Sequence, residues 1–131
     1  MFTSGVFDYV NVLNKAADAS SYRNEVLSNN IANATTPGYK RKDVAFEQSL
    51  SRAIESAGTE ADSLTKKVHN IDLDTAKATL YVDRAELSYR LDENNVDIST
   101  ENSELASNQL IYEGLIDSIN SEFSRLKSVL K

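Results

Sequence analysis

The chain has 131 residues, a length that suits one domain, and its 40% hydrophobic content is ordinary for a globular protein. A net charge of −6 and a pI near 4.8 argue against general nucleic-acid binding, because the chain lacks a basic surface for phosphates. The absence of cysteine excludes disulfides, thiolate catalysis and sulfur-bound metals.

The chain carries few helix breakers and no long apolar run. Four glycines and one proline favour long helices over many short strands. No stretch approaches the ~18 uninterrupted apolar residues of a membrane span, so we expect no membrane-spanning segment. Residues 1–20 lack the basic and apolar regions of a Sec signal peptide. The cytoplasm is therefore the default location, unless export uses a route without a cleaved signal.

Small and apolar side chains recur at alternating steps of four and three through residues 3–31, which predicts an amphipathic helix with a heptad seam. Thr3 or Ser4 is the expected N-cap. Ser20 and Asn24 occupy two seam positions and weaken its centre. The predicted seam residues here are Val6, Val10, Leu13, Leu27 and Ile31.

A corner, "NNIANATTPGYKRK" at residues 29–42, follows this helix. The run Thr36-Pro37-Gly38-Tyr39 suits a type II turn, because proline presets one central residue and glycine accepts positive φ at the next. The asparagines at 29, 30 and 33 can bond nearby backbone groups as the helix ends. The basic residues 40–42 are either a solvated turn exit or a contact for an acidic neighbour.

The middle of the chain gives weaker signals. Apolar residues from Phe46 to Ala57 have helical spacing, which predicts a short helix ended by Gly58. Residues 59–79 are polar, and we expect them to be irregular. Residues 80–91 fit a strand or a helix, because Leu80 and Val82 alternate, as do Leu87, Tyr89 and Leu91. We prefer short strands or extended segments.

The C-terminal third predicts the clearest helix. Its steps of four and three are unbroken, and Gln109 is the one polar residue among them. Ser99 or Thr100 can cap its start, and Glu101 and Glu104 place negative charge where the helix dipole favours it. The predicted seam residues of this helix are Leu105, Tyr112, Ile116, Ile119, Phe123, Leu126 and Leu130.

These elements predict a mainly α fold. Long N- and C-terminal helices should pack as a coiled-coil-like pair, with a small irregular or short-β middle region. We divide the chain into an N-terminal helix (1–33), a turn, short helix and projecting middle (34–98), and a C-terminal helix (99–131). Because polar residues interrupt both seams, we expect the seams also to make contacts between molecules.

The sequence gives little support for a catalytic function. His69 is the one histidine and has no nucleophile motif beside it, so we interpret it as a solvated loop residue. The acidic runs at 72–74 and 92–95 lack calcium-loop spacing, and the glycines stand too far apart for a phosphate loop. We therefore predict no enzyme and no catalytic, cofactor-binding or metal site.

Two segments resemble the flagellar axial proteins, the rod and hook family. "LSNNIANATTPGYKRKDVAFEQSL", residues 27–50, is similar to their N-terminal signature, whose turn motif falls here on Asn30, Asn33, Thr36, Pro37, Gly38 and Tyr39. Residues 94–130 look like the end of a short proximal rod subunit, with an Asn-Asn-Val-Asp entry and a Glu-Leu-Ala-x-Asn-x-x-x-Tyr run. Residues 51–93 show no matching motif.

The resemblance implies a structural subunit of the flagellar rod. Such subunits polymerise helically through their terminal helices, transmit torque and line the export channel. It implies a place in the basal body, within the cell envelope and periplasm, reached through flagellar type III export without a cleaved signal peptide. Its implied partners are further copies of itself, the rod protein FlgC, the adaptor FliE and the export gate. Tyr39, Lys40 and Arg41 would face neighbouring subunits.

Three alternatives remain at this point. FlgC itself is the alternative within the family. A soluble coiled-coil adaptor or secretion chaperone is the alternative from another class. A small hydrolase comes last, because no catalytic constellation is present in the sequence.

Overall fold

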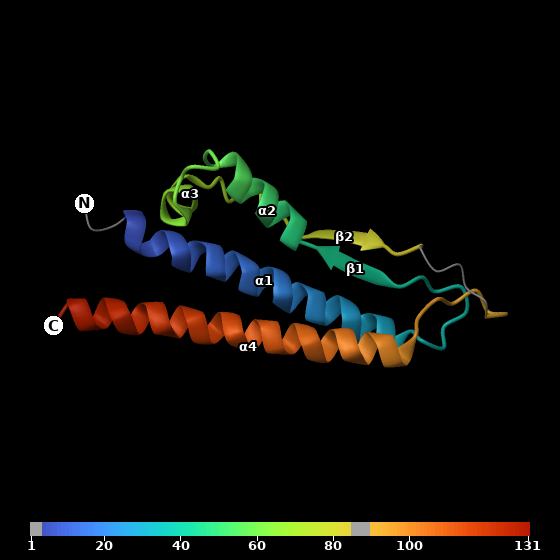
Figure 1. Cartoon of the computed structure of the whole chain (residues 1–131). Coiled ribbons are helices and arrows are strands. Elements are labelled where there is room, and N and C mark those ends of the chain that lie inside the picture. Colours follow the sequence, from blue (N-terminus) through green and yellow to red (C-terminus); the bar gives the residue numbers. More distant parts are fainter. Residues whose placement is uncertain (1–3, 85–89) are drawn as a thin grey trace.

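The computed structural model describes residues 4–84 and 90–131, with the side chains of Ser4 and Val6 excepted. Two long helices, α1 (Ser4–Ala32) and α4 (Ile98–Val129), lie side by side and run antiparallel, so that the start of α1 and the end of α4 lie at the same end of the molecule (Figure 1). The expected mainly α fold with paired terminal helices is confirmed.

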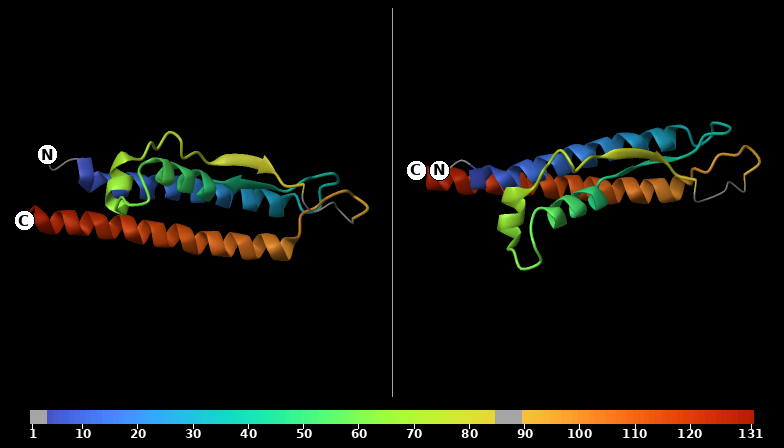
Figure 2. Two further views of the ribbon diagram at one scale, coloured as in Figure 1. Left: turned by 45° about the horizontal axis from the view of Figure 1, so that its top comes forward. Right: turned by 90° about the horizontal axis from the view of Figure 1, so that it is seen from above.

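The middle of the chain lies along α1 and projects to one side of the helix pair (Figure 2). It contains β1 (Lys42–Ala45), α2 (Glu47–Ser56), α3 (Leu64–Asn70) and β2 (Thr79–Val82). The two strands form an antiparallel sheet in which Lys42 lies opposite Val82 and Ala45 opposite Thr79. The short helix and the strand at 79–82 agree with the sequence predictions, whereas β1 was not predicted.

Three predictions for the middle region were wrong. Residues 59–79 are not irregular throughout, because they contain α3, and Leu91 lies in a turn rather than a strand. Leu87 and Tyr89 lie outside the described residues. His69 is in α3 rather than a loop, with its Nδ1 2.6 Å from Asp8 Oδ2 of α1.

Tertiary contacts explain α3, which is too short to be stable alone. The Ser63 side chain accepts a hydrogen bond from Lys66 N, which caps its first turn. Val68 is buried with 4% of its surface exposed, and the Thr65 hydroxyl lies 3.1 Å from the Tyr9 hydroxyl of α1. Burial against α1 supplies the stability that sequence-local signals do not reveal.

The pairing of α1 with α4 includes a buried polar layer. Asn108 donates from Nδ2 to Ser20 O and to Asn24 Oδ1, each at 2.8 Å, and Ser20 Oγ donates to Asn108 Oδ1 at 3.2 Å. The predicted seam placed Gln109 here, which was wrong, because Gln109 is exposed and the shorter Asn108 side chain fills the layer.

The start of α4 also differs from the prediction. Asp97, rather than Ser99 or Thr100, is the N-cap, and its carboxylate accepts hydrogen bonds from Thr100 Oγ1 at 2.9 Å and Ser99 N at 3.0 Å. These bonds hold the pKa of the Asp97 carboxyl below its ordinary value. The serine and threonine therefore serve as donors to the cap.

Most of the apolar core is made by α1 and the elements packed on it. Leu27 is the largest apolar side chain that is fully buried, and small residues let neighbouring elements approach closely. The buried apolar residues are Val10, Ala17, Ala19, Val26, Leu27, Ala34, Val44, Ala53, Val68, Ala76, Val96 and Ile119.

We predict that Leu27→Ala lowers the free energy of unfolding by about 2–5 kcal/mol, because it opens a cavity at a fully buried site. Leu110→Ala is the matched control. Leu110 is 71% exposed on α4, so its truncation should change stability by less than about 0.5 kcal/mol. Urea unfolding of both variants measures the difference, and equal effects would contradict this description of the core.

Candidate functional site

The corner after α1 contains the predicted turn. Tyr39 N donates to Thr36 O at 3.2 Å, and Gly38 has φ of 72°, as the second central residue of a type II turn requires. A Cβ at Gly38 would meet no atom within 4 Å beyond its two neighbours in the chain, so the backbone conformation is the reason for glycine here. Pro37 and Thr36 are exposed at the tip of the turn.

Asn94 holds this turn from the returning chain, and sequence reasoning missed its role. Its fully buried amide donates to Asn33 O at 2.8 Å, Ala34 O at 3.0 Å and Thr36 O at 2.9 Å. Asn33 itself acts locally, as expected, and donates from Nδ2 to Asn29 O at 2.7 Å. The signal for Asn94 was its place in the Asn-Asn-Val-Asp run.

Asn30 joins three elements instead of ending a helix. Its Nδ2 donates to Lys42 O at 2.7 Å and its Oδ1 accepts from Lys42 N at 2.9 Å, so the side chain pairs with β1 as a strand would. The same amide donates to Glu101 Oε2 of α4 at 3.0 Å, and the Tyr39 hydroxyl donates to Asn30 Oδ1 at 3.1 Å. Asn30 is fully buried.

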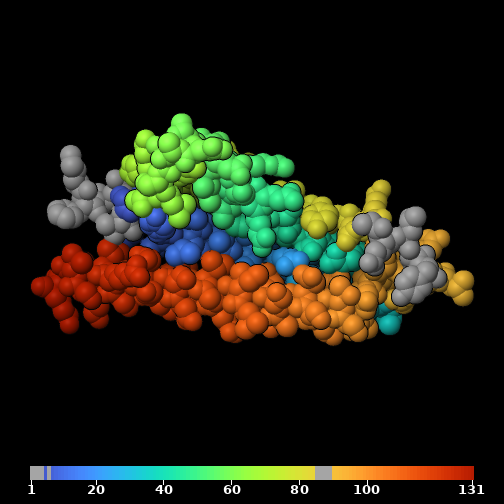
Figure 3. Space-filling model, in the orientation of Figure 1, coloured from blue at the N-terminus to red at the C-terminus, as the bar shows by residue number. Residues whose placement is uncertain are grey.

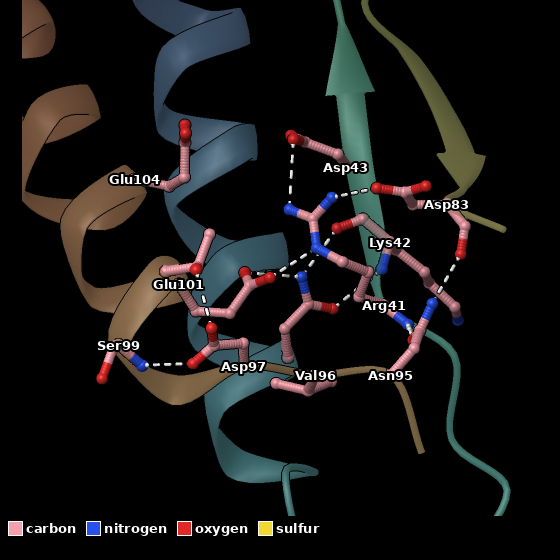
Figure 4. A network of polar contacts seen from close by, with 12 residues as sticks. Arg41, Lys42, Asp43, Asp83, Asn95, Val96, Asp97, Ser99, Glu101 and Glu104 are labelled. Atoms are coloured by element: carbon pink, nitrogen blue, oxygen red, sulfur yellow. Dashed lines mark hydrogen bonds and ion pairs between the residues drawn. The ribbon is translucent and has the colours of Figure 1, made fainter. Parts of the chain in front are cut away.

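Arg41 lies at the centre of the same network (Figure 4). Its guanidinium reaches Glu101 Oε1 at 2.5 Å, Asp83 Oδ2 at 2.6 Å and Asp43 Oδ2 at 3.4 Å. Burial lowers the pKa of Arg41, but hydrogen bonds to Glu101 and Asp83 outweigh it and raise the pKa above its ordinary value. The carboxylates that partner Arg41 therefore belong to its own chain.

This arrangement gives four residues contacts that the sequence did not predict. Arg41 and Tyr39, which were expected to face neighbouring subunits, form bonds within the chain, and Lys40 Nζ contacts Glu93 O. Glu101 is 0% exposed and pairs with Arg41, so it does more than complement the helix dipole. The sequence could not show this, because the partners lie 60 residues apart.

A second ion pair extends the network along α1. Arg23 binds Asp43 through two bonds, Nε to Oδ1 at 2.7 Å and Nη2 to Oδ2 at 3.0 Å, and reaches Glu104 Oε2 at 2.9 Å. Burial raises the pKa of Asp43, but the bonds from Arg23 and from Val44 N outweigh it, so the pKa lies below its ordinary value of 3.8.

We call Asn30, Arg41, Asp43, Asp83, Asn95 and Glu101 the polar joint. Asn95 completes it, because its Oδ1 accepts from Arg41 N at 2.7 Å and its Nδ2 donates to Asp83 O at 2.9 Å. Throughout the described part of the chain, every buried side-chain nitrogen and oxygen has a partner. A fully satisfied network of this kind fixes geometry, and here it ties the β1–β2 sheet to both long helices.

The predicted seam residues are distributed unevenly over the helix pair. Val10, Leu27 and Ile119 are buried, whereas Phe123 is 48% and Leu130 85% exposed. The Val6 side chain lies outside the described residues. The remaining seam residues are partly buried, and they are Leu13, Ile31, Leu105, Tyr112, Ile116 and Leu126.

Within residues 4–84 and 90–131, no group of three or more histidine, aspartate or glutamate side chains is arranged to hold a metal ion. The same described ranges contain no helix with the length and apolar content that crossing a membrane would need. The candidate site consists of the polar joint and the exposed surfaces of the two long helices.

We predict opposite effects for two glycine-to-alanine changes. Gly38→Ala should lower the free energy of unfolding by about 1–2 kcal/mol, because an L-residue is disfavoured at positive φ. Gly114→Ala, in the interior of α4 with open space around it, should raise it by about 0.5–1 kcal/mol. Denaturant unfolding tests the pair, and stabilisation by Gly38→Ala would contradict the turn assignment.

The depressed pKa of Asp43 predicts a pH dependence. A carboxyl with a lowered folded-state pKa contributes stability that is complete above its ordinary value of 3.8 and is lost as pH falls through the folded-state value. Asp43→Asn should therefore be less stable than wild type at neutral pH, and the difference should shrink below about pH 4. Urea unfolding across pH, with the exposed Asp18→Asn as control, measures it. A difference that grows on acidification would contradict this.

Comparison with known proteins places the chain among rod proteins. A family model described as "Flagella basal body rod protein" matches residues 11–40. The protein named flagellar basal body rod protein FlgB of Bacillus subtilis (strain 168) is 37% identical over 119 residues, which cover 90% of this chain and 89% of that protein.

Relatives with the same name occur in other bacteria. The Escherichia coli (strain K12) protein is 31% identical over 123 residues, covering 89% of this chain and 88% of the relative. The Borrelia hermsii protein is 33% identical over 129 residues, covering 93% and 95%. The alternative identity FlgC was wrong, because these relatives carry the name FlgB. With such identity across most of both chains, the chain belongs to the FlgB family of flagellar basal-body rod proteins.

Proposed function

We propose that this chain is a proximal-rod subunit that polymerises helically through its terminal helices, transmits torque and lines the export channel. One observation carries the proposal: α4 and its C-cap, Leu130, expose large apolar side chains that the described part of the chain leaves uncovered. Leu110 is 71%, Val129 80% and Leu130 85% exposed. The family, a structural component of the flagellar rod, supplies the context.

The exposed residues favour assembly on energetic grounds. Fully burying one such side chain contributes roughly 1.5–3 kcal/mol. Several on one helix therefore contribute to the driving force for association, which must exceed the cost of ordering two subunits. The predicted seam residues Phe123 and Leu130 belong to this exposed set, whereas Leu27 and Ile119 already pack within the chain.

The polar joint supports a mechanical role. Its ion pairs and hydrogen bonds link α1, β1, α4 and Asp83 just beyond β2, so force on the projecting middle region would pass to the helix pair through these bonds. In this proposal residues 1–33 and 99–131 form the inner layer and residues 34–98 project outward. The turn motif from Asn30 to Tyr39 sets the direction of that projection.

The proposal includes partners and a location. The chain would contact its own copies, FlgC, the adaptor FliE and the export gate in the basal body, after type III export without a cleaved signal peptide. Immunodetection in purified basal bodies is the direct test. Absence there, with a stable cytoplasmic oligomer instead, would overturn the rod function in favour of the adaptor alternative.

We predict that Leu110→Asp abolishes incorporation into the rod without unfolding the subunit. The side chain is exposed, so a charge is tolerated in the monomer, but burial between subunits would leave that charge unpaired. Gln109→Asp is the matched control, since it places the same charge on the adjacent exposed residue of α4. Swimming in soft agar and basal-body blots measure the outcome, and normal motility of Leu110→Asp would contradict the assembly role of this face.

A further inference from the structure

An open groove of about 730 Å³ runs between α1, α4 and the β1–α2 segment. In Figure 3 the blue atoms of α1 are visible between orange α4 and green α2. On the α1 side the groove is lined by the small side chains of Ala16, Ala19 and Ser20 and by Arg23, and α4 contributes Ile111 and Leu115 to one wall. Small residues on a helix let another helix approach closely, so the groove has the shape of a helix-docking site.

The rim of this groove is acidic. Glu47 and Glu104 lie on opposite walls, from α2 and α4. Glu104 shares Arg23 with Asp43, and Glu47 has no ion pair among the described residues. A partner that places lysine or arginine beside these carboxylates, with apolar side chains between, matches the groove in charge and polarity.

The far end of the same chain has that chemistry. We call residues 123–131 the tip. It exposes Phe123 by 48%, Val129 by 80% and Leu130 by 85%. Lys127 and Lys131 lie among these residues and have no ion pair in the described part of the chain. The basic residues of α4 are confined to this end, whereas Ile98–Ile119 contains only acidic charges.

We propose that the tip of one copy docks in the groove of a second copy, with Lys127 and Lys131 beside Glu47 and Glu104. This contact rests on the proposed function, because it supplies a self-association step of the rod. The two surfaces cannot meet in one molecule: Ile111 and Leu130 are about 28 Å apart along α4 at 1.5 Å per residue. Contact between two different surfaces is heterologous, and it builds an open helical filament unless the rotation between copies closes a ring.

A structural role for the charges alone does not explain the tip. Cations at a helix C-terminus complement the helix dipole, which accounts for Lys127 and Lys131. It does not account for Val129 and Leu130, which lie exposed beside them. Apolar and basic groups on the same two turns fit an acidic apolar groove, and a second copy supplies both.

Cysteine cross-linking tests the contact directly, since the chain contains no cysteine. Ile111→Cys, carrying an affinity tag, is mixed with untagged Leu130→Cys under a mild oxidant. We expect mixed disulfide dimers well above those from the control pair Asn102→Cys and Leu130→Cys, because Asn102 is exposed on α4 outside the groove. Mixed dimers no more abundant than in the control would overturn the proposal.

Charge reversal provides a second, independent measurement. Lys127→Glu with Lys131→Glu in the Leu130→Cys chain should reduce mixed dimers about fivefold, as expected for the loss of surface ion pairs worth about 1 kcal/mol. Glu47→Lys in the Ile111→Cys chain should restore them. Unchanged cross-linking in the reversed variant would contradict the proposed orientation.

The same variants in cells separate this contact from the rod function. Chains found in basal bodies, with cross-linking no higher than in the control, would overturn the docking contact and leave the function intact. Mixed dimers in solution, with no chain in basal bodies, would support the contact and overturn the function. Cross-links in basal bodies mainly to a protein of different mass would show that another rod component occupies the groove, which contradicts docking of a second copy.

Discussion

The buried carboxylate of Glu101 is the constraint on which the rest of the structure depends. Arg41 Nε binds one oxygen at 2.5 Å and Asn30 Nδ2 the other at 3.0 Å. A buried charge costs several kcal/mol unless it is paired and hydrogen-bonded, so α4, α1 and the chain entering β1 must converge here. Other packings of these elements would leave Glu101 or Arg41 without compensation, which selects one direction for the sheet.

A second polar layer sets the alignment of the helices farther along. Apolar side chains tolerate small shifts along a helix pair, whereas Asn108 can bond Ser20 and Asn24 only at one register. Beyond Ile119 no comparable layer joins α1 to α4 within the described residues, and Phe123, Val129 and Leu130 are exposed there. The two polar layers therefore fix the register of the helix pair near the corner, whereas the C-terminal end of α4 keeps exposed apolar side chains.

The sequence predicted what depends on local spacing and turn chemistry. Steps of three and four residues located both long helices, and Pro37-Gly38 located the turn. It could not predict β1, because Asp43 and Val44 are buried by contacts with α1 and β2 rather than by a local pattern. The choice of Asn108 over Gln109 likewise depends on register, and two adjacent polar residues give no local signal for it. Arg41 could be identified as the partner of Glu101 only from the folded structure, because the two residues are far apart in the sequence.

In the proposed contact, ion pairs and buried apolar side chains would contribute different amounts of free energy and so have different roles. Exposed ion pairs contribute only about 0.2–1 kcal/mol each, so the charges on the tip and the groove rim would select orientation rather than provide affinity. Affinity would come from burying apolar residues such as Val129 and Leu130, at roughly 1.5–3 kcal/mol each. The polar joint works in the opposite sense, because desolvation makes any broken pair costly. The polar joint would keep the shape of each subunit constant, while the exposed apolar residues at the C-terminal end of α4 would form the same weak contact between successive copies.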